Sequence, residues 1–167
     1  NDTARHYVKD CWIEGAVDYF YGGGNVLAEN CTFYNTRSGA IIVAPCHKEA
    51  KWGYVFRDCT IDGNEAAANV KKWGVKLGRP WHNSPKTVYI HTTMNIPISP
   101  EGWANMGAIP TLFAEYNSRD AAGNVLQLDQ RKTEYEGRGE NAPKGTSRAV
   151  ITAEEASQLE AFSSLGL

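Results

Sequence analysis

One carboxylate stands among residues that do not usually surround a charge. Asp18 lies in the run Ala16-Val17-Asp18-Tyr19-Phe20-Tyr21, and three glycines follow at positions 22 to 24. Burying a carboxylate among apolar groups is costly unless it is paired or hydrogen-bonded. The aromatic rings beside Asp18 offer faces on which sugar rings can stack. From these residues alone, a turn aspartate at a strand end before a glycine loop is the competing interpretation.

An arginine lies in a second constrained segment, Leu77-Gly78-Arg79-Pro80-Trp81. A proline biases the residue before it towards an extended backbone. The Arg79 guanidinium would therefore point in a defined direction, next to the Trp81 indole. The alternative is a structural arginine at the end of a strand.

Three short segments repeat one pattern and could position these side chains. Residues 9–15, 29–33 and 57–63 each read as a charged residue, Asp or Asn, Cys, one further residue, and then Ile or Phe. Their cysteines, Cys11, Cys31 and Cys59, are 20 and 28 residues apart. Coils of about this length are typical of a parallel β-helix. A fourth candidate covers residues 87–94, with Thr or Met where the others have Cys.

Stacking of coils explains the repeat physically. Equivalent residues on successive coils lie about 4.8 Å apart, so the three cysteines would form an inward column of small apolar groups. The Asp or Asn before each cysteine suits a turn. We therefore expect free core thiols at these positions. Because the chain has no CxxC pair, and adjacent Cys46 and His47 are weak evidence, we expect no metal site.

The remaining segments complete an all-β chain. Runs at residues 40–44 and 75–77 predict further strands, and the polar, glycine-rich stretch from Asn117 to Gly145 reads as long surface loops. The tetrad Thr152-Ala153-Glu154-Glu155 matches a capping box, and residues 156–162 favour a helix. We expect one domain over residues 1–167, a solenoid with a short C-terminal helix on its outside.

Composition argues against two classes of partner. The 167 residues are 42% hydrophobic and 22% charged, with a formal net charge of −2. Lys and Arg are scattered along the chain, which argues against nucleic-acid binding. No apolar run approaches the roughly 18 residues that a membrane span requires, and residues 1–5 do not resemble a signal peptide.

Four segments, in order, resemble signatures of the pectin methylesterase (pectinesterase) family. The run around Asp18 is similar to Gly-Thr-Val-Asp-Phe-Ile-Phe-Gly, and the Leu-Gly-Arg-Pro-Trp run at 77–81 matches a second signature without change. Ile-Ser-Pro-Glu-Gly-Trp at 98–103 and Ala-Glu-Tyr-Asn at 114–117 resemble two further blocks. The resemblance covers nearly the whole chain. It implies the family fold, a right-handed, single-stranded parallel β-helix.

The resemblance also implies residue roles. Asp18 matches the family nucleophile and Arg79 the arginine that orients it. Asp18 would attack the C6 methyl ester of a galacturonate in methyl-esterified pectin (homogalacturonan), giving an acyl-enzyme and methanol, and water would then hydrolyse the acyl-enzyme. No metal or organic cofactor is implied.

Substrate contacts are expected from the aromatic residues around this pair. Trp81 matches an aromatic that lines the family's substrate cleft. Tyr21 is expected to do the same, and Tyr19 and His82 are further candidates. Glu101, Glu115 and Trp103 lie in family-like blocks and read as structural residues.

The chain departs from the family pattern at its N-terminal end. The family needs a second Asp as general acid and base, and glutamines that stabilise the oxyanion, upstream of the nucleophile. Asp2 and Asp10 do not lie in the required Gln-Asp-Thr context. We therefore expect these groups in N-terminal coils that this chain lacks, and a chain that is monomeric but prone to association at its uncovered edge. Ala16 also replaces a usual Thr.

Three other functions stay open at this point. A pectate lyase would need clustered carboxylates for calcium, and a polygalacturonase would need closely placed Asp groups; neither cluster is visible near Asp18 or Arg79. A non-catalytic module could bind polygalacturonate through Tyr19, Tyr21 and Trp81. Since pectin is extracellular, a secreted, periplasmic or cell-surface location is expected.

Overall fold

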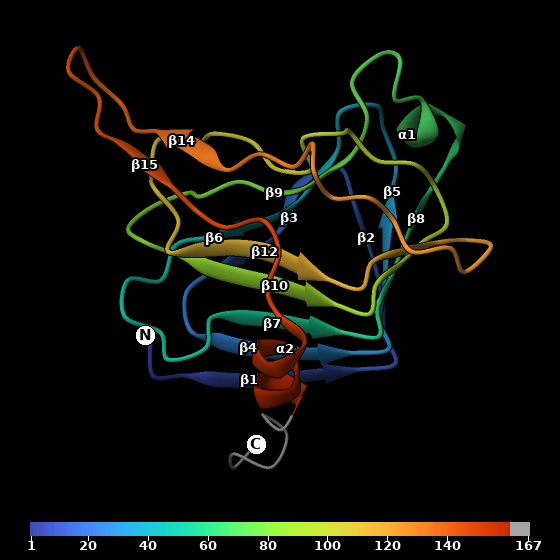
Figure 1. Cartoon of the computed structure of the whole chain (residues 1–167), viewed down its shortest axis with the longest axis horizontal. Coiled ribbons are helices and arrows are strands. Elements are labelled where there is room, and N and C mark those ends of the chain that lie inside the picture. The colour runs from blue at the N-terminus through green and yellow to red at the C-terminus, as the bar shows by residue number, and fades with distance from the viewer. Residues whose placement is uncertain (161–167) are drawn as a thin grey trace.

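The computed structural model describes residues 1–160 and contains three parallel sheets that wind around one core (Figure 1). Sheet A contains, in spatial order, β1 (Arg5–Lys9), β4 (Asn25–Glu29), β7 (Tyr54–Arg57), β10 (Lys86–Ile90) and β12 (Leu112–Tyr116). Sheet B contains β2 (Trp12–Gly15), β5 (Thr32–Asn35), β8 (Thr60–Gly63), β11 (Thr93–Met94) and β13 (Arg119–Asp120). Sheet C contains β3 (Val17–Gly22), β6 (Ile41–Pro45) and β9 (Lys76–Gly78).

The chain passes through sheets A, B and C in turn on the first three coils and through sheets A and B on the last two, and each coil stacks in parallel on the one before it. In Figure 1 sheet A faces the viewer, with β1 at the bottom and β12 at the top, and sheet C lies behind it. The winding that results is right-handed. The predicted right-handed parallel β-helix is therefore confirmed.

One residue in the left-handed conformation makes the corner between sheets A and B on every coil. These residues have φ between 49° and 57°, and they are Asp10, Asn30, Asp58, His91 and Asn117. Asn and Asp tolerate this conformation better than most residues. The predicted turn positions are thus confirmed, and Asn117 adds a fifth coil that the repeat analysis did not include.

The residues after these corners form the predicted column. Cys31 and Cys59 are buried free thiols, and Thr92 and Ser118 continue the column on later coils. Burial raises the pKa of the Cys59 thiol to about 12, which makes it chemically inert at neutral pH. Cys11 is a free thiol but is exposed, unlike the core position expected, because it lies on the first coil, which forms the end of the stack.

Aromatic rings fill the lumen between the sheets. Neighbouring rings from successive coils lie 4.6 to 5.8 Å apart, and they run in the order Phe33, Phe56, Tyr89, Trp103 and Phe113. Such contacts add to the free energy gained by removing these large rings from water. Trp103 is 1% exposed, so its predicted structural role is confirmed.

A short helix covers the outside of sheet A, as predicted. Helix α2 (Ala153–Glu160) begins with the expected capping box: the Glu155 amide donates to Thr152 Oγ1 (3.2 Å), and the Thr152 amide donates to Glu155 Oε1 (3.1 Å). Ala156 packs on an outer cluster that contains Leu27 and Val55, and Figure 1 shows α2 in front of sheet A. Residues 161–162 of the predicted helix lie outside the described residues. No helix within residues 1–160 has the length and apolarity of a membrane span.

The stretch from 117 to 145 is not only surface loop. It contains β14 (Glu134–Glu136), which forms an antiparallel hairpin with β15 (Lys144–Thr146). The side chain of Tyr135 is buried, while its neighbours in β14 are exposed. A strand with one inward residue carries too little hydrophobic alternation to be visible in the sequence. Helix α1 (Glu65–Ala68), capped by Asn64, was also not expected.

A buried ion pair ties the last coil to the segment before the hairpin. Arg131 Nε lies 2.6 Å from Glu115 Oε2, and the two side chains are 7% and 0% exposed. Ser118 Oγ also donates to Glu115 Oε1 (2.8 Å). Glu101 is different: it pairs with Lys76 at 3.4 Å and is 59% exposed. Glu115 therefore has a buried arginine partner, as expected of a structural residue, whereas Glu101 pairs with a lysine at the surface.

Glu115→Gln should destabilise the chain much more than Glu101→Gln. Removing one charge of a buried pair leaves the other uncompensated, which costs about 3 kcal/mol or more, whereas an exposed pair contributes less than about 1 kcal/mol. Urea unfolding of both variants measures the difference. Equal losses of unfolding free energy would show that the Glu115–Arg131 pair is not the anchor described.

Candidate active site on sheet C

An irregularity in β3 sets the position of Asp18. Val17 pairs with Ile41 and Phe20 with Val43, so β3 has one residue more than β6 over this stretch. Asp18 adopts φ of 53° inside this bulge. Bulges re-aim side chains and are frequent next to functional sites, and non-glycine residues with positive φ gather there too. The bulge leaves the Asp18 side chain partly exposed on the outer face of sheet C, at 21%.

Arg79 holds the Asp18 carboxylate with two hydrogen bonds. Its Nε donates to Oδ1 (2.9 Å) and its Nη2 to Oδ2 (2.6 Å). Arg79 directly follows β9, two strands away from β3, and its amide donates to Val43 O (3.0 Å), so the sheet fixes its backbone. The predicted contact is thus present, although the residues are 61 positions apart.

The geometry of this pair orients the carboxylate rather than merely stabilising the fold. Two parallel N–H···O bonds from a planar guanidinium fix the carboxylate plane. A carboxylate offers about four acceptor sites, so two remain on the outward side. Since both side chains are about a quarter exposed, the pair contributes only on the order of 1 kcal/mol to stability. Asp18 can therefore present an oriented oxygen to a bound electrophile.

Two of the predicted substrate contacts lie together beside the pair, and a third adjoins them. The Tyr21 and Trp81 rings meet edge to face at 6.0 Å, and His82 stacks on Trp81 at 4.9 Å. Tyr21 is 68% exposed, so most of its ring remains open to a bound ligand. Tyr21 lies one residue before the end of β3, and the Trp81 amide donates to Pro45 O (3.1 Å) at the end of β6. Tyr21, Trp81 and His82 are called the aromatic wall below.

The structure does not bring Tyr19 to the aromatic wall. Its ring packs against the core and over Gly15, where an added Cβ would lie 2.3 Å from Tyr19 Cγ. Its hydroxyl donates to Asn35 Oδ1 (3.0 Å), and burial raises the Tyr19 pKa well above its usual value. The extra residue in β3 is the reason, because both Tyr19 and Phe20 then pack against the core. This position gives no support to the predicted substrate contact.

Hydrogen bonds to the segment after β6 fix the loop that carries Trp81 and His82. Asn83, with φ of 61°, donates from Nδ2 to Cys46 O (2.8 Å), and the Lys86 amide donates to His47 Nε2 (2.7 Å). Burial lowers the His47 pKa to about 4. His47 therefore serves as a neutral hydrogen-bond acceptor. No group of three metal-ligating side chains occurs among residues 1–160.

A hollow of about 520 Å³ opens next to Arg79 on the side of the later coils. The hairpin β14–β15 and the loop after Trp103 form its walls, with Met106, Glu136 and Arg138 among the lining residues. Arg138 Nη2 donates to Met106 O (2.9 Å). None of these residues was predicted. They belong to no motif in the sequence, and the unexpected hairpin brings them to the site.

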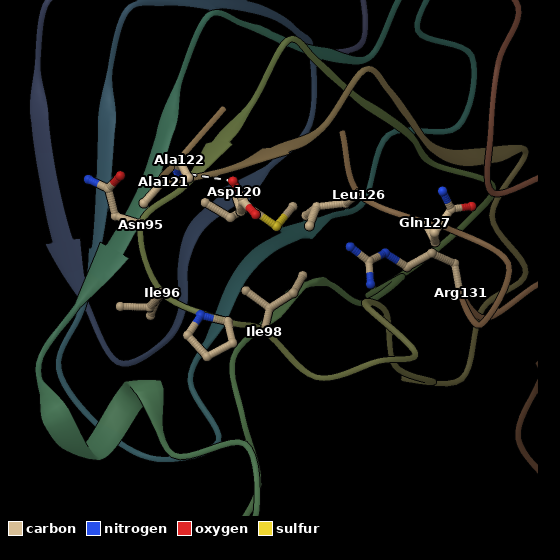
Figure 2. A pocket seen from close by; sticks show the side chains of 11 residues that line it. Asn95, Ile96, Ile98, Asp120, Ala121, Ala122, Leu126, Gln127 and Arg131 are labelled. Atoms are coloured by element: carbon tan, nitrogen blue, oxygen red, sulfur yellow. Dashed lines mark hydrogen bonds between the residues drawn. The ribbon is translucent and has the colours of Figure 1, made fainter. Parts of the chain in front are cut away.

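A second hollow, of about 470 Å³, adjoins the end of β11, whose Met94 lines it, and Figure 2 shows its lining side chains. Ile96, Ile98 and Leu126 make much of its surface. Its charged residues already have partners: Asp120 accepts from the Ala122 and Asn124 amides, and Arg131 pairs with Glu115. Arg79 does not line this hollow, whose polar groups are structural, so the candidate site is the outer face of sheet C.

Comparisons with known proteins agree with this architecture. The family model described as Pectinesterase matches residues 1–152. The chain is 32% identical over 132 residues to Pectinesterase 2 of Olea europaea, which covers 75% of this chain and 34% of that protein. A pectin methylesterase from Aspergillus niger has a similar structure, with a TM-score of 0.66 and 27% identity over 77% of this chain and 42% of that one. A pectin methylesterase from carrot shares the fold, with a TM-score of 0.70 and 20% identity over 91% of this chain and 47% of that one.

The stacked coils and the surface pair on sheet C define a parallel β-helix protein of the kind that these solved structures represent. The chain belongs to the pectinesterase family. It spans about a third of the length of the curated relatives it matches.

The wild-type chain should lose stability as the pH falls from about 6.5 to about 4, in part through His47. The unfolded chain takes up this proton near pH 6.5, and the folded chain takes it up only near pH 4, so acid favours unfolding across that window. His47→Gln keeps an acceptor for the Lys86 amide but does not titrate. Urea unfolding from neutral pH to about pH 4 should therefore show a smaller acid loss for His47→Gln. Parallel pH profiles of the two proteins would contradict the buried neutral imidazole.

Proposed function

We propose that this protein hydrolyses C6 methyl esters of galacturonate units in pectin, with Asp18 as the nucleophile. The observation that carries the proposal is the bidentate Asp18–Arg79 pair on the outer face of sheet C, beside the aromatic wall. Membership of the pectinesterase family supports the choice of substrate. Pectate lyase and polygalacturonase chemistry would need clustered carboxylates, and Asp18 pairs with a guanidinium instead.

In the first step, an Asp18 oxygen attacks the ester carbonyl carbon. A bond forms between this oxygen and C6, and the methoxy group leaves as methanol after it gains a proton. The product is an acyl-enzyme in which Asp18 and the galacturonate share an anhydride oxygen. Arg79 holds the attacking carboxylate in one plane, so little reorganisation is needed at the moment of attack. Tyr21 and Trp81 offer faces on which the sugar rings of the polymer can lie.

In the second step, water attacks the acyl carbon and releases the galacturonate carboxylate and free Asp18. Both steps need a proton donor and acceptor, and hydrogen-bond donors for the oxyanion. Asp2 and Asp10 have other roles. Asp2 accepts from the Lys48 and Glu49 amides (2.8 and 3.0 Å), and Asp10 accepts from Asn30 Nδ2 (2.7 Å).

We infer that the proton donor and acceptor, and the hydrogen-bond donors for the oxyanion, belong to coils that stack on β1–β3. The first coil exposes large apolar side chains: Tyr7 at 50%, Trp12 at 60% and Val17 at 38%. In a solenoid such a surface is covered by the next repeat. Without that cover, the open edge of β1 favours association between copies, and with it a monomer is the expected state.

The proposed substrate determines the expected partner and cellular location. Methyl-esterified pectin is the expected partner, and this substrate argues for a secreted, periplasmic or cell-surface protein. Neither nucleic acid nor membrane is an expected partner, and the two-step chemistry requires no cofactor.

Asp18→Asn should abolish methanol release from highly methylated pectin, with a loss of about 10⁴-fold or more, because the amide cannot replace a nucleophilic carboxylate. Arg79→Lys keeps the positive charge but loses the bidentate hydrogen bonds to Asp18, and should lower kcat by about 10²-fold. The rates are measured on this chain and on the product of its complete gene.

Trp103→Phe is a useful control, since the Trp103 ring is buried in the core against Tyr89 and Phe113 and does not belong to the aromatic wall. It should lower stability with little effect on methanol release per folded molecule. An Asp18→Asn protein that releases methanol at the wild-type rate would exclude the proposed mechanism.

A further inference from the structure

A cationic patch lies beside the candidate site, at the opposite end of sheet C from the aromatic wall. A hollow of about 560 Å³ is lined by Arg37, Lys72, Trp73 and Lys76, with Glu101 as its single carboxylate. The patch carries three positive charges against one negative charge, in a chain whose formal net charge is −2. The turn before β6, the loop before β9, the first residue of β9 and residues 99–101 after β11 form it.

Two close backbone contacts hold Trp73 with its ring outward. Gly39 has φ of 72°, and a Cβ added to it would lie 3.2 Å from Trp73 Cβ. Gly74, with φ of 68°, lies so near Ser99 that an added Cβ would be 3.0 Å from the Ser99 amide nitrogen. These contacts anchor the loop, yet Trp73 remains 67% exposed. Trp73 therefore presents a large apolar face to solvent from an anchored loop.

The charges of the patch are only partly neutralised. Lys76 donates to Ser99 Oγ (3.0 Å) and pairs with Glu101 (3.4 Å). Arg37 donates from Nε to Ser38 O (3.2 Å), which leaves its two terminal nitrogens for other acceptors. Within residues 1–160, no carboxylate pairs with Arg37 or Lys72.

The patch, the Asp18–Arg79 pair and the aromatic wall follow one another along the strands of sheet C. Lys76 shares a register row with Ile41, which pairs with Val17, the neighbour of Asp18. From Lys76, Arg79 is three residues further along the chain and Trp81 five. At about 3.3 Å per residue, the patch lies roughly 10 Å from the pair and roughly 16 Å from the wall. One extended polymer could touch all three.

We propose that Arg37, Lys72, Trp73 and Lys76 form an accessory subsite for de-esterified galacturonate units of the polymer whose ester lies at Asp18. This inference rests on the proposed function. A free carboxylate matches the open guanidinium and ammonium donors, and the Trp73 ring offers a stacking face for the sugar. A methyl-esterified unit carries no charge, so the subsite distinguishes the two forms. The reaction product is therefore itself a ligand of the protein.

Calorimetric titration of the chain with a fully de-esterified oligogalacturonate tests the subsite. Lys72→Gln should weaken binding about two- to fivefold, and Trp73→Ala about two- to tenfold. The effect of Lys72→Gln should shrink at high salt, because added salt screens charges over shorter distances than the roughly 8 to 10 Å typical of about 0.1 to 0.15 M. Affinity for a fully methyl-esterified oligomer should not change in Lys72→Gln.

Matched controls are available on other faces of the molecule. Lys9→Gln removes an exposed charge from β1, and Trp12→Ala removes a ring that is 60% exposed on β2. Neither should change the affinity for the de-esterified oligomer. The subsite is excluded if the wild-type chain does not bind this oligomer, or if Lys72→Gln and Lys9→Gln bind it equally. Failure of the proposed function would show separately, as absence of methanol release from methylated pectin by the product of the complete gene.

Discussion

The in-register stacking of coils is the constraint on which the rest of the structure depends. Residues on neighbouring coils meet because their strands pair in parallel, not because they are close in sequence. Asp18 and Arg79 are separated by 61 positions, and they form a bidentate pair because β3, β6 and β9 stack in one sheet. The left-handed corners at Asp10, Asn30 and Asp58 hold this register, since each turns the chain at the same point of its coil.

Rigidity of the scaffold and exposure of the site are consequences of the same layout. The aromatic rings that fill the lumen and the buried Glu115–Arg131 pair at the last coils make the scaffold rigid. The proposed chemistry lies on the outer face of sheet C, where the bulge at Asp18 turns one carboxylate towards solvent. Loops after β6 and β9 carry the aromatic wall, and buried, neutral His47 fixes them to one another.

Features that repeat or pair locally could be predicted from the sequence. The Asp/Asn-Cys pattern predicted the coils and their corners, and the Thr152–Glu155 capping box predicted α2. The family resemblance predicted the contact between Arg79 and Asp18. The hairpin that carries Arg138 escaped prediction because only Tyr135 in its first strand faces inward. Tyr19 was a candidate substrate contact because it lies next to Asp18 in the sequence, and the one-residue bulge that packs it against the core is visible only in the pairing with β6.

The covalent intermediate on Asp18 is the most direct test of the account. The protein would be quenched while it hydrolyses a methylated oligogalacturonate, and the modified residue would be identified by peptide mass spectrometry. The account predicts a galacturonyl group on the peptide that contains Asp18, and none in Asp18→Asn. Methanol release accompanied by an adduct on another residue, or an adduct that persists in Asp18→Asn, would contradict it.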